Sequence, residues 1–230
     1  MKATPSNNRR LTILDAAIRD FIATGLPVSS SELYKKYGFN VKPATIRNEL
    51  LALTDEGFLI QPHTSAGRVP TDKGYQFFVE HILRNELAGK AEEAHQHALN
   101  LRNCADFVDR MADQLRLLSV GYEAEEKEMH KTGLEELFRH LDYINKEEVY
   151  EVANDFEHLD ERVDKIFEYL TGGLPKVFIG KSPITRSPHL SVVAEVFQAD
   201  DDQILLMAIG PKRMNYEKVL KAFKDIKHKK

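Results

Sequence analysis

The chain of 230 residues contains a single cysteine, Cys104, and no tryptophan. One cysteine excludes an intramolecular disulfide and leaves no CxxC pair for zinc, so we expect Cys104 to be a buried bystander. The longest apolar stretches, such as Ile204–Ile209, fall far short of the roughly 20 residues that a membrane span requires. The first ten residues are polar and lack the apolar core of a secretory signal. We therefore expect a cytoplasmic protein.

Signatures of catalysis and of metal binding are also missing. No glycine-rich phosphate loop follows a strand, no Ser/His/Asp or Cys/His arrangement has supporting context, and no HExxH motif occurs. His95 and His97 are two residues apart and would face different sides of a helix, which does not indicate a metal site. We expect neither an enzyme nor a cofactor or resident metal.

The net charge of −4 is the sum of two parts of opposite sign. Residues 1–85 contain 11 Lys and Arg against 8 Asp and Glu, or +3, and the remaining residues contain 21 against 28, or −7. Phosphate binding depends on local charge, so a nucleic acid would contact the N-terminal part. The basic residues from which contacts could be drawn are Lys2, Arg9, Arg10, Lys35, Lys36, Lys42, Arg47, Arg68 and Lys73.

The most informative stretch begins with a helix predicted over about 43–56. Pro43 suits the first turn, and Gly57 suits a left-handed cap just beyond the last turn. The apolar stripe of this helix consists of Ile46, Leu50 and Leu53, and the outer faces carry Thr45, Arg47, Asn48 and Thr54. Arg47 and Asn48 suit bidentate contact with guanine and adenine edges, and Thr45 can reach a phosphate or a thymine methyl group. An ordinary solvated helix face is the alternative.

A basic hairpin is predicted directly after this helix. Phe58–Ile60 and Arg68–Val69 read as short antiparallel strands, separated by a polar loop that contains Pro62 and Gly67. Such a wing contacts the phosphate backbone or the minor groove, with Gly67 allowing close backbone approach. The wing and its flanks supply the candidate DNA-binding residues Lys42, His63, Thr64, Ser65, Gly67, Arg68 and Lys73.

Supporting helices are predicted on both sides. A first helix covers residues 8–24, and Ser29 with Glu32 forms a capping box for a second helix that extends to about Tyr37. This order completes a helix-turn-helix before the wing. Thr71 caps a further helix from Asp72 to about Arg84.

These segments carry a family resemblance. Ala44–Leu59 (ATIRNELLALTDEGFL) and Gln61–Tyr75 (QPHTSAGRVPTDKGY) resemble the N-terminal winged-helix domain of the bacterial heat-inducible transcription repressor family, HrcA. The upstream segment TGLPVSSSEL is similar but has Ser29 where the family usually has Gly and Ser31 where it usually has Arg. The resemblance implies an operator upstream of chaperone genes and a GroEL-type chaperonin as a partner that keeps the repressor active.

The remainder predicts helices and then a sheet. Residues 86–120 read as one long amphipathic helix that packs either on the C-terminal domain or on its twin in a dimer, and residues 123–131 read as a charged joint. The further elements expected are helices over about 146–156 and 160–170, antiparallel strands 176–179, 190–197 and 204–209, and a final helix 216–226.

The C-terminal part is similar to the same family. Val177–Pro183, Leu190–Phe197 and Ala208–Val219 resemble its C-terminal region, which implies a GAF-like α+β domain. This chain is shorter than usual members, and the missing length falls where the family carries an inserted dimerising domain. Gly210 and Arg213 either bind an anionic effector or form a simple strand-to-helix turn.

The predicted fold class is α+β. It comprises a winged helix-turn-helix domain over residues 1–85, a helical connector that could dimerise over 86–131, and a shortened GAF-like domain with a small antiparallel sheet over 132–230. The predicted function is repression of heat-shock genes by a homodimer bound to an inverted repeat in double-stranded DNA. A ligand-sensing winged-helix regulator and an interaction module that has lost DNA binding are the alternatives.

Overall fold

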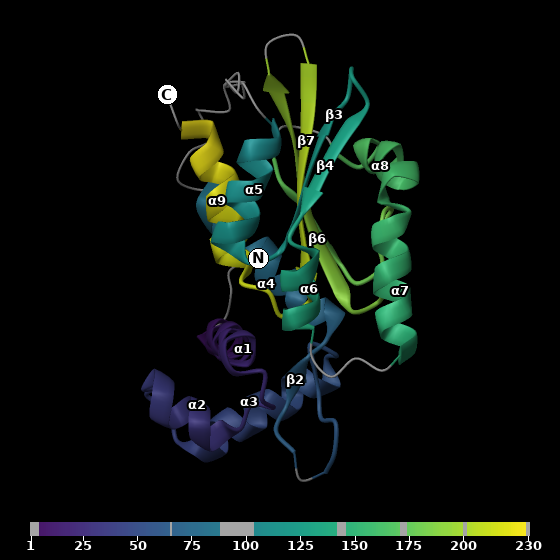
Figure 1. The fold of residues 1–230 in the computed structure, drawn as a ribbon. Helices are drawn as coiled ribbons and strands as arrows, with labels where there is room; N and C mark the ends of the chain where they lie inside the picture. The colour runs from purple at the N-terminus through teal and green to yellow at the C-terminus, as the bar shows by residue number, and fades with distance from the viewer. Residues whose placement is uncertain are drawn as a thin grey trace. The chain divides into compact units, whose positions relative to one another are not determined.

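The structure is a computed structural model that describes residues 5–64, 66–87, 104–141, 146–170, 174–199 and 202–228. The chain divides into two compact units, Met1–Ala88 and Gly89–Lys230, and most of their elements are labelled in Figure 1. Within the described ranges, no helix combines the length and the apolar character needed to cross a membrane.

The first unit consists of helices with one short hairpin. Its elements are α1 (Pro5–Thr24), α2 (Ser30–Tyr37), α3 (Pro43–Asp55), β1 (Leu59–Ile60), β2 (Val69–Pro70) and α4 (Asp72–Leu87). The order confirms the predicted series of three helices, a hairpin and a further helix. Its core comes from the apolar stripes of these helices and includes Ile13, Leu14, Ile18, Leu33, Ile46, Leu50, Leu53 and Phe78.

Local sequence signals set the ends of these helices. Ser29 accepts a hydrogen bond from the Glu32 backbone N–H at 3.2 Å, and the Glu32 carboxylate accepts one from the Ser29 backbone, which is the predicted capping box. Gly57 has a φ of 78°, so it supplies the left-handed turn expected after α3. Thr71 caps α4 by accepting a hydrogen bond from the Gly74 backbone N–H at 3.1 Å.

The hairpin after α3 forms at nearly the predicted positions. Leu59 pairs with Pro70 and Ile60 with Val69, so the return strand begins one residue later than expected. Arg68 pairs instead with Val28 through two backbone hydrogen bonds of 2.8 and 2.9 Å. The segment between α1 and α2 therefore adds a third edge to the hairpin and fixes it to the helices.

The second unit is built on one sheet. Its elements are α5 (Cys104–Leu115), β3 (Leu118–Glu123), β4 (Glu128–Thr132), α6 (Leu134–His140), α7 (Lys146–Glu157), α8 (Leu159–Phe167), β5 (Lys176–Ile179), β6 (Leu190–Ala199), β7 (Asp202–Pro211) and α9 (Tyr216–His228). The five strands are antiparallel in the order β4-β3-β7-β6-β5. The unit is therefore a mixed α+β structure.

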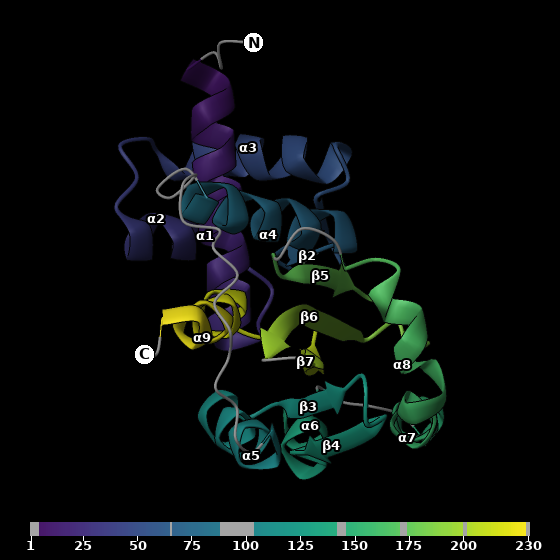
Figure 2. The ribbon, with the colours of Figure 1, turned by 90° about the horizontal axis from the view of Figure 1, so that it is seen from above.

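Helices cover both faces of this sheet. Figures 1 and 2 show α5 and α9 on one face and α7 and α8 on the other. Alternate residues of each strand point to opposite faces, and residues of both sets are buried. On the α7 and α8 face the core cluster includes Leu118, Val120, Leu137, Val152, Val163, Ile166, Val192, Leu205 and Met207.

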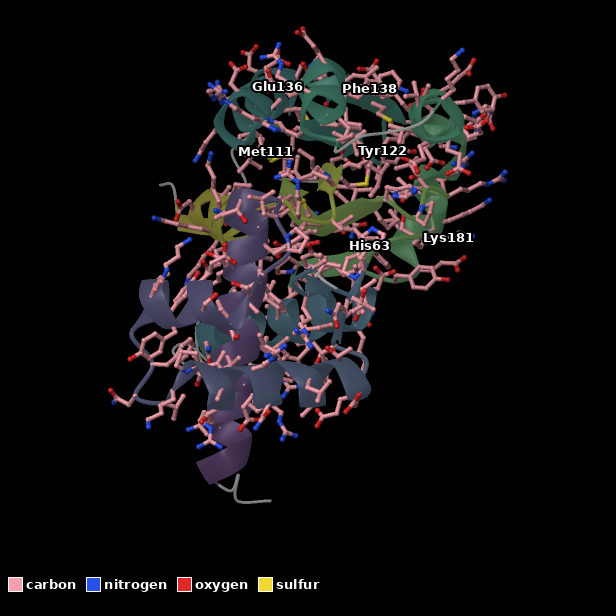
Figure 3. All side chains as sticks on the ribbon, turned by 90° about the horizontal axis from the view of Figure 1, so that it is seen from below. His63, Met111, Tyr122, Glu136, Phe138 and Lys181 are labelled. Carbon is pink, nitrogen blue, oxygen red and sulfur yellow. The ribbon has the colours of Figure 1, made fainter. Side chains whose placement is uncertain are left out.

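The structure corrects the expectation for residues 86–131. The helix predicted to continue to Val120 ends at Leu115, and residues 118–132 form the hairpin β3–β4 where a helix end and a charged joint were expected. Residues 88–103 of that predicted helix lie outside the described residues. Val108 and Met111 of α5 are buried within the unit, and Met111 is labelled in Figure 3. The apolar stripe of α5 therefore packs on the protein's own sheet, not on a second copy.

A glycine allows α5 to lie close to the sheet. A Cβ atom on Gly121 of β3 would lie 2.6 Å from Cys104 Sγ and 2.6 Å from Val108 Cγ2. Burial raises the pKa of the Cys104 thiol to about 12, with a smaller contribution from the negative charge of Glu123. The prediction that Cys104 is buried is confirmed.

Candidate nucleic-acid interface

The outer face of α3 is the centre of the candidate interface. Arg47 and Asn48 are exposed, and in the described part of the chain neither side chain makes a hydrogen bond or an ion pair. Thr45 is half-buried, and Lys42 is exposed at the residue before the helix. Leu51, which the sequence analysis did not select, is 51% exposed. Residues one turn apart share a face, so Leu51 lies beside Arg47 and Asn48.

The inner face of α3 is fixed to α1 by a carboxylate. Glu49, with a side chain 9% exposed, accepts hydrogen bonds from Arg9 Nη2 at 2.8 Å and from Arg10 Nε at 2.9 Å. Arg10 also pairs with Glu56 near the end of α3. Burial by itself raises the pKa of the Glu49 carboxyl, but the hydrogen bonds from Arg10 and Arg9 outweigh burial and hold that pKa below its ordinary value. These contacts set the rotation of α3, which keeps Arg47 outside.

Several basic residues of the predicted pool already have partners inside the first unit. Arg9 and Arg10 bind Glu49, and Lys36 Nζ lies 2.5 Å from Asp20 Oδ1. Lys73 donates to the Glu56 carbonyl at 2.6 Å and lies over the Phe58 ring, 4.3 Å from its centroid. Lys2 lies outside the described residues. Within the described part of the chain, four residues of this pool have neither an ion pair nor a hydrogen bond to their side chains: Lys35, Lys42, Arg47 and Arg68.

The loop between β1 and β2 is braced from within. Gln61 Nε2 donates to the carbonyls of Thr64 at 2.9 Å and Ala66 at 3.0 Å. His63, which is labelled in Figure 3, and Thr64 are exposed on this loop, and Ser65 lies outside the described residues. A loop held in this way presents its polar side chains with little ordering cost on binding.

Two wing residues have structural roles that the sequence analysis did not foresee. A Cβ on Gly67 would lie 2.5 Å from the Val28 carbonyl oxygen and 2.6 Å from that of Pro27, so this glycine permits close packing within the first unit. The Arg68 Nε atom is buried and, within the described residues, has no hydrogen-bond partner. Arg68 thus retains a donor that the described part of the protein does not satisfy.

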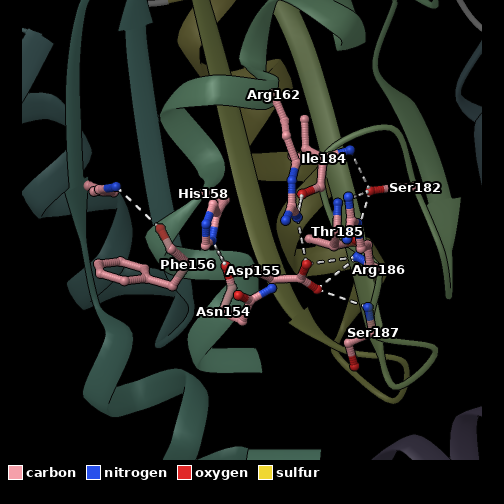
Figure 4. Close-up of polar contacts among 11 residues, drawn as sticks. Asn154, Asp155, Phe156, His158, Arg162, Ser182, Ile184, Thr185, Arg186 and Ser187 are labelled. Atoms are coloured by element: carbon pink, nitrogen blue, oxygen red, sulfur yellow. Dashed lines mark hydrogen bonds and ion pairs between the residues drawn. The ribbon is translucent and has the colours of Figure 1, made fainter. Parts of the chain in front are cut away.

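The second unit contains a buried ionic centre that sequence reasoning missed (Figure 4). Asp155 of α7 is 1% exposed and accepts a hydrogen bond from Arg162 Nη1 at 2.7 Å. The same carboxylate accepts the backbone N–H groups of Arg186 and Ser187 at 2.8 Å, and Arg162 donates to the Ile184 carbonyl at 3.1 Å. This network ties the loop between β5 and β6 to α7 and α8.

The end of β7 at Gly210 and the turn that contains Arg213 are packed by apolar side chains. A Cβ on Gly210 would lie 2.6 Å from Leu117 Cδ2 and 3.2 Å from Met214 Sδ. Tyr216, fully buried, donates to Ser191 Oγ at 2.9 Å or to the Lys212 carbonyl at 2.6 Å. Half-buried Arg213 lies in the same turn. The described contacts account for this segment as a strand-to-helix connection.

Comparison with known proteins gives the chain a family. Residues 76–220, well over half of the chain, match the family described as HrcA protein C terminal domain. A heat-inducible transcription repressor HrcA of Alkaliphilus metalliredigens (strain QYMF) is 58% identical over 80 residues, which is 35% of this chain and 23% of that protein. The protein of that name from Nocardioides sp. (strain ATCC BAA-499 / JS614) is 45% identical over 111 residues, which is 48% of this chain and 33% of that protein.

A solved structure shares the fold of the whole chain. The crystal structure of a hypothetical protein at 2.2 Å resolution superposes with a TM-score of 0.72 at 19% identity and covers 96% of both chains. The curated relatives are longer than this chain, and the matched segments span only a third or less of their length. The family match does not depend on that length, and the chain belongs to the HrcA family.

Proposed function

We propose that this protein is a DNA-binding transcriptional repressor of heat-shock and chaperone genes, and that it binds an inverted repeat as a homodimer. The first unit acts as a winged helix-turn-helix domain, in which α2 and α3 form the helix-turn-helix and β1–β2 the wing. The second unit is the GAF-like domain. The heat-inducible repressors to which the chain is similar support the class of target genes.

The observation that carries the proposal is the outer face of α3. Arg47 and Asn48 are adjacent, exposed and unengaged in the described part of the chain, and Glu49 holds the opposite side of the helix to α1. A helix fixed in rotation presents its donors in one geometry, which base-edge recognition requires. Lys42 and the wing residues His63, Thr64 and Arg68 would then contact the backbone.

The proposal of a dimer rests on the small size of one winged-helix domain. One winged helix reads only a few base pairs, and specificity generally requires two copies spaced to match half-sites. Because the apolar stripe of α5 packs on the sheet, we propose that the second copy binds at another surface. The chaperonin partner that the family resemblance implies stays a prediction.

Selection from a pool of randomised duplexes at moderate salt tests the proposal. Wild-type protein is expected to enrich one sequence with two inverted half-sites, and Arg47→Ala/Asn48→Ala protein is expected to enrich none. Arg84→Ala is the matched control, because Arg84 is exposed on α4 and pairs only with Glu80 in the described structure. Absence of any enriched sequence with wild-type protein would refute sequence-specific binding.

A further inference from the structure

We infer that Leu51 is a specificity-determining residue that contacts the 5-methyl group of a thymine in the major groove. The inference rests on the proposed function and assigns a base to a residue that the proposal leaves unused. Leu51 is 51% exposed on α3, whereas the other leucines of this helix, Leu50 and Leu53, are buried, with at most 1% of their surface exposed.

The first argument for this contact is the position of Leu51 relative to Arg47 and Asn48 on α3. It follows Asn48 by three residues and Arg47 by four, so the three side chains form one stripe. Among the described residues of the first unit, the other exposed large apolar ones, Leu26, Tyr34 and Ile60, lie on other segments. Leu51 is thus the large apolar side chain that accompanies the hydrogen-bonding pair on the exposed face of α3.

The second argument is the chemistry of the groups in the DNA major groove. A leucine can neither donate nor accept a hydrogen bond, so a partner that covers it gains affinity only by presenting an apolar group. Among the groups at the major-groove edges of the base pairs, the apolar one is the thymine methyl, and apolar side chains discriminate thymine through it. A phosphate or a base donor opposite Leu51 would lose hydration without compensation.

Helix geometry places that thymine. Four residues of α-helix advance about 6 Å, close to two base-pair steps of about 3.4 Å each. The thymine is therefore expected one or two base pairs from the base that Arg47 reads. Removing one buried methyl group is expected to weaken affinity about threefold to fourfold. The same change in both half-sites of a dimer is expected to weaken it about tenfold.

Deoxyuridine substitution measures this contact directly, because deoxyuridine pairs as thymidine does but lacks the methyl group. Each thymine of the enriched duplex is replaced in turn, and dissociation constants are compared for wild type, Leu51→Ala and Leu51→Met. For wild type and Leu51→Met, one position near the Arg47-dependent base is expected to weaken binding about threefold to fourfold per half-site. For Leu51→Ala, the same substitution is expected to have no effect.

The controls separate the outcomes. Leu26→Ala removes a leucine that is 67% exposed outside α3, and its response to deoxyuridine is expected to equal that of wild type. Equal losses in wild type and Leu51→Ala, no loss at any thymine, or no A·T pair at that position would each overturn the inference while leaving DNA binding intact. A dimer that dissociates in Leu51→Ala would identify a second copy as the occupant and also overturn it. Failure to enrich any duplex refutes the proposed function first, and the inference with it.

Discussion

Replacing Glu49 with Gln tests the contact that orients the DNA-reading helix. The Glu49 side chain is 9% exposed and accepts hydrogen bonds from two arginines of α1 that are 40 and 39 residues away in sequence. Gln has nearly the same shape and keeps one acceptor oxygen, but it removes the negative charge. The substitution therefore probes the ionic part of the α1–α3 contact without creating a cavity.

The expected loss of unfolding free energy depends on how far Glu49 and its two arginine partners are buried. Hydrogen bonds to a charged group contribute about 1.5–3 kcal/mol each when they are protected from water. The arginine side chains are 40% and 32% exposed, so water replaces part of what they lose. We expect a total loss of about 1–2 kcal/mol, equivalent to roughly 5–15 °C in melting temperature for a domain of this size.

The pH dependence has a definite sign. The folded pKa of Glu49 lies below its ordinary value, so its contribution to stability is present above the unfolded value of about 4.3 and disappears as pH falls through the folded pKa. Protonated Glu49 resembles Gln. The difference in unfolding free energy between wild type and Glu49→Gln is therefore expected to be constant from about pH 7 to 5 and to decrease as pH falls below about 4.3.

Urea denaturation followed by circular dichroism gives the free energies, and hydrogen exchange of the α1 and α3 amides localises the change to the first unit. Glu80→Gln is the matched control, because Glu80 forms an exposed pair with Arg84 and should change stability by less than about 1 kcal/mol. The reasoning is wrong if the two variants lose equal stability, or if the Glu49→Gln difference persists in acid.

Three other substitutions test the candidate DNA-reading helix α3 and the second unit. Arg47→Ala should cost about 1–3 kcal/mol on the selected duplex and less on random DNA, measured by fluorescence anisotropy; equal losses would make Arg47 a backbone contact. Asp155→Asn should cost about 3–5 kcal/mol in urea unfolding because it leaves buried Arg162 without its anion, whereas Asp160→Asn at an exposed pair should cost less than about 1 kcal/mol. Gly121→Ala should destabilise by about 1–3 kcal/mol, and less so in a Cys104→Ala background, because the added methyl meets Cys104 Sγ; additive effects in this cycle would contradict the packing.

The local elements of the first unit could be predicted because their determinants are close in sequence. Ser29 and Glu32 are three residues apart, and Gly57 directly follows the helix that it ends. The role of Glu49 could not be predicted in this way, because its partners lie in α1 and a carboxylate on an amphipathic helix reads as solvated. The one local signal was its register, since Glu49 falls between Ile46 and Leu50 on the buried side.

The hairpin β3–β4 was missed for a different reason. Leu118 and Val120 continue the apolar spacing of α5, so the predicted helix was extended over them, although Leu118, Val120 and Tyr122 also alternate with Ser119, Gly121 and Glu123 as in a strand. The charged residues after Glu123 form its turn. The Asp155 centre was also out of reach, because two of its donors are backbone N–H groups 31 and 32 residues further along the chain.

The ion pairs within the first unit limit how strongly one copy attracts DNA. The described basic residues of the pool that already have partners are Arg9, Arg10, Lys36 and Lys73, and those without are Lys35, Lys42, Arg47 and Arg68. If Lys35, Lys42 and Arg68 contact phosphates while Arg47 reads a base, log Kd should change with log salt by about 2.7 units per copy and about 5.4 for two copies. A slope of about 3 or less on the selected duplex, measured together with a protein-to-duplex ratio of one by light scattering, would contradict the homodimer. A slope of about 5.4 with a ratio of two would support it, because these three residues of one copy are too few to produce that dependence.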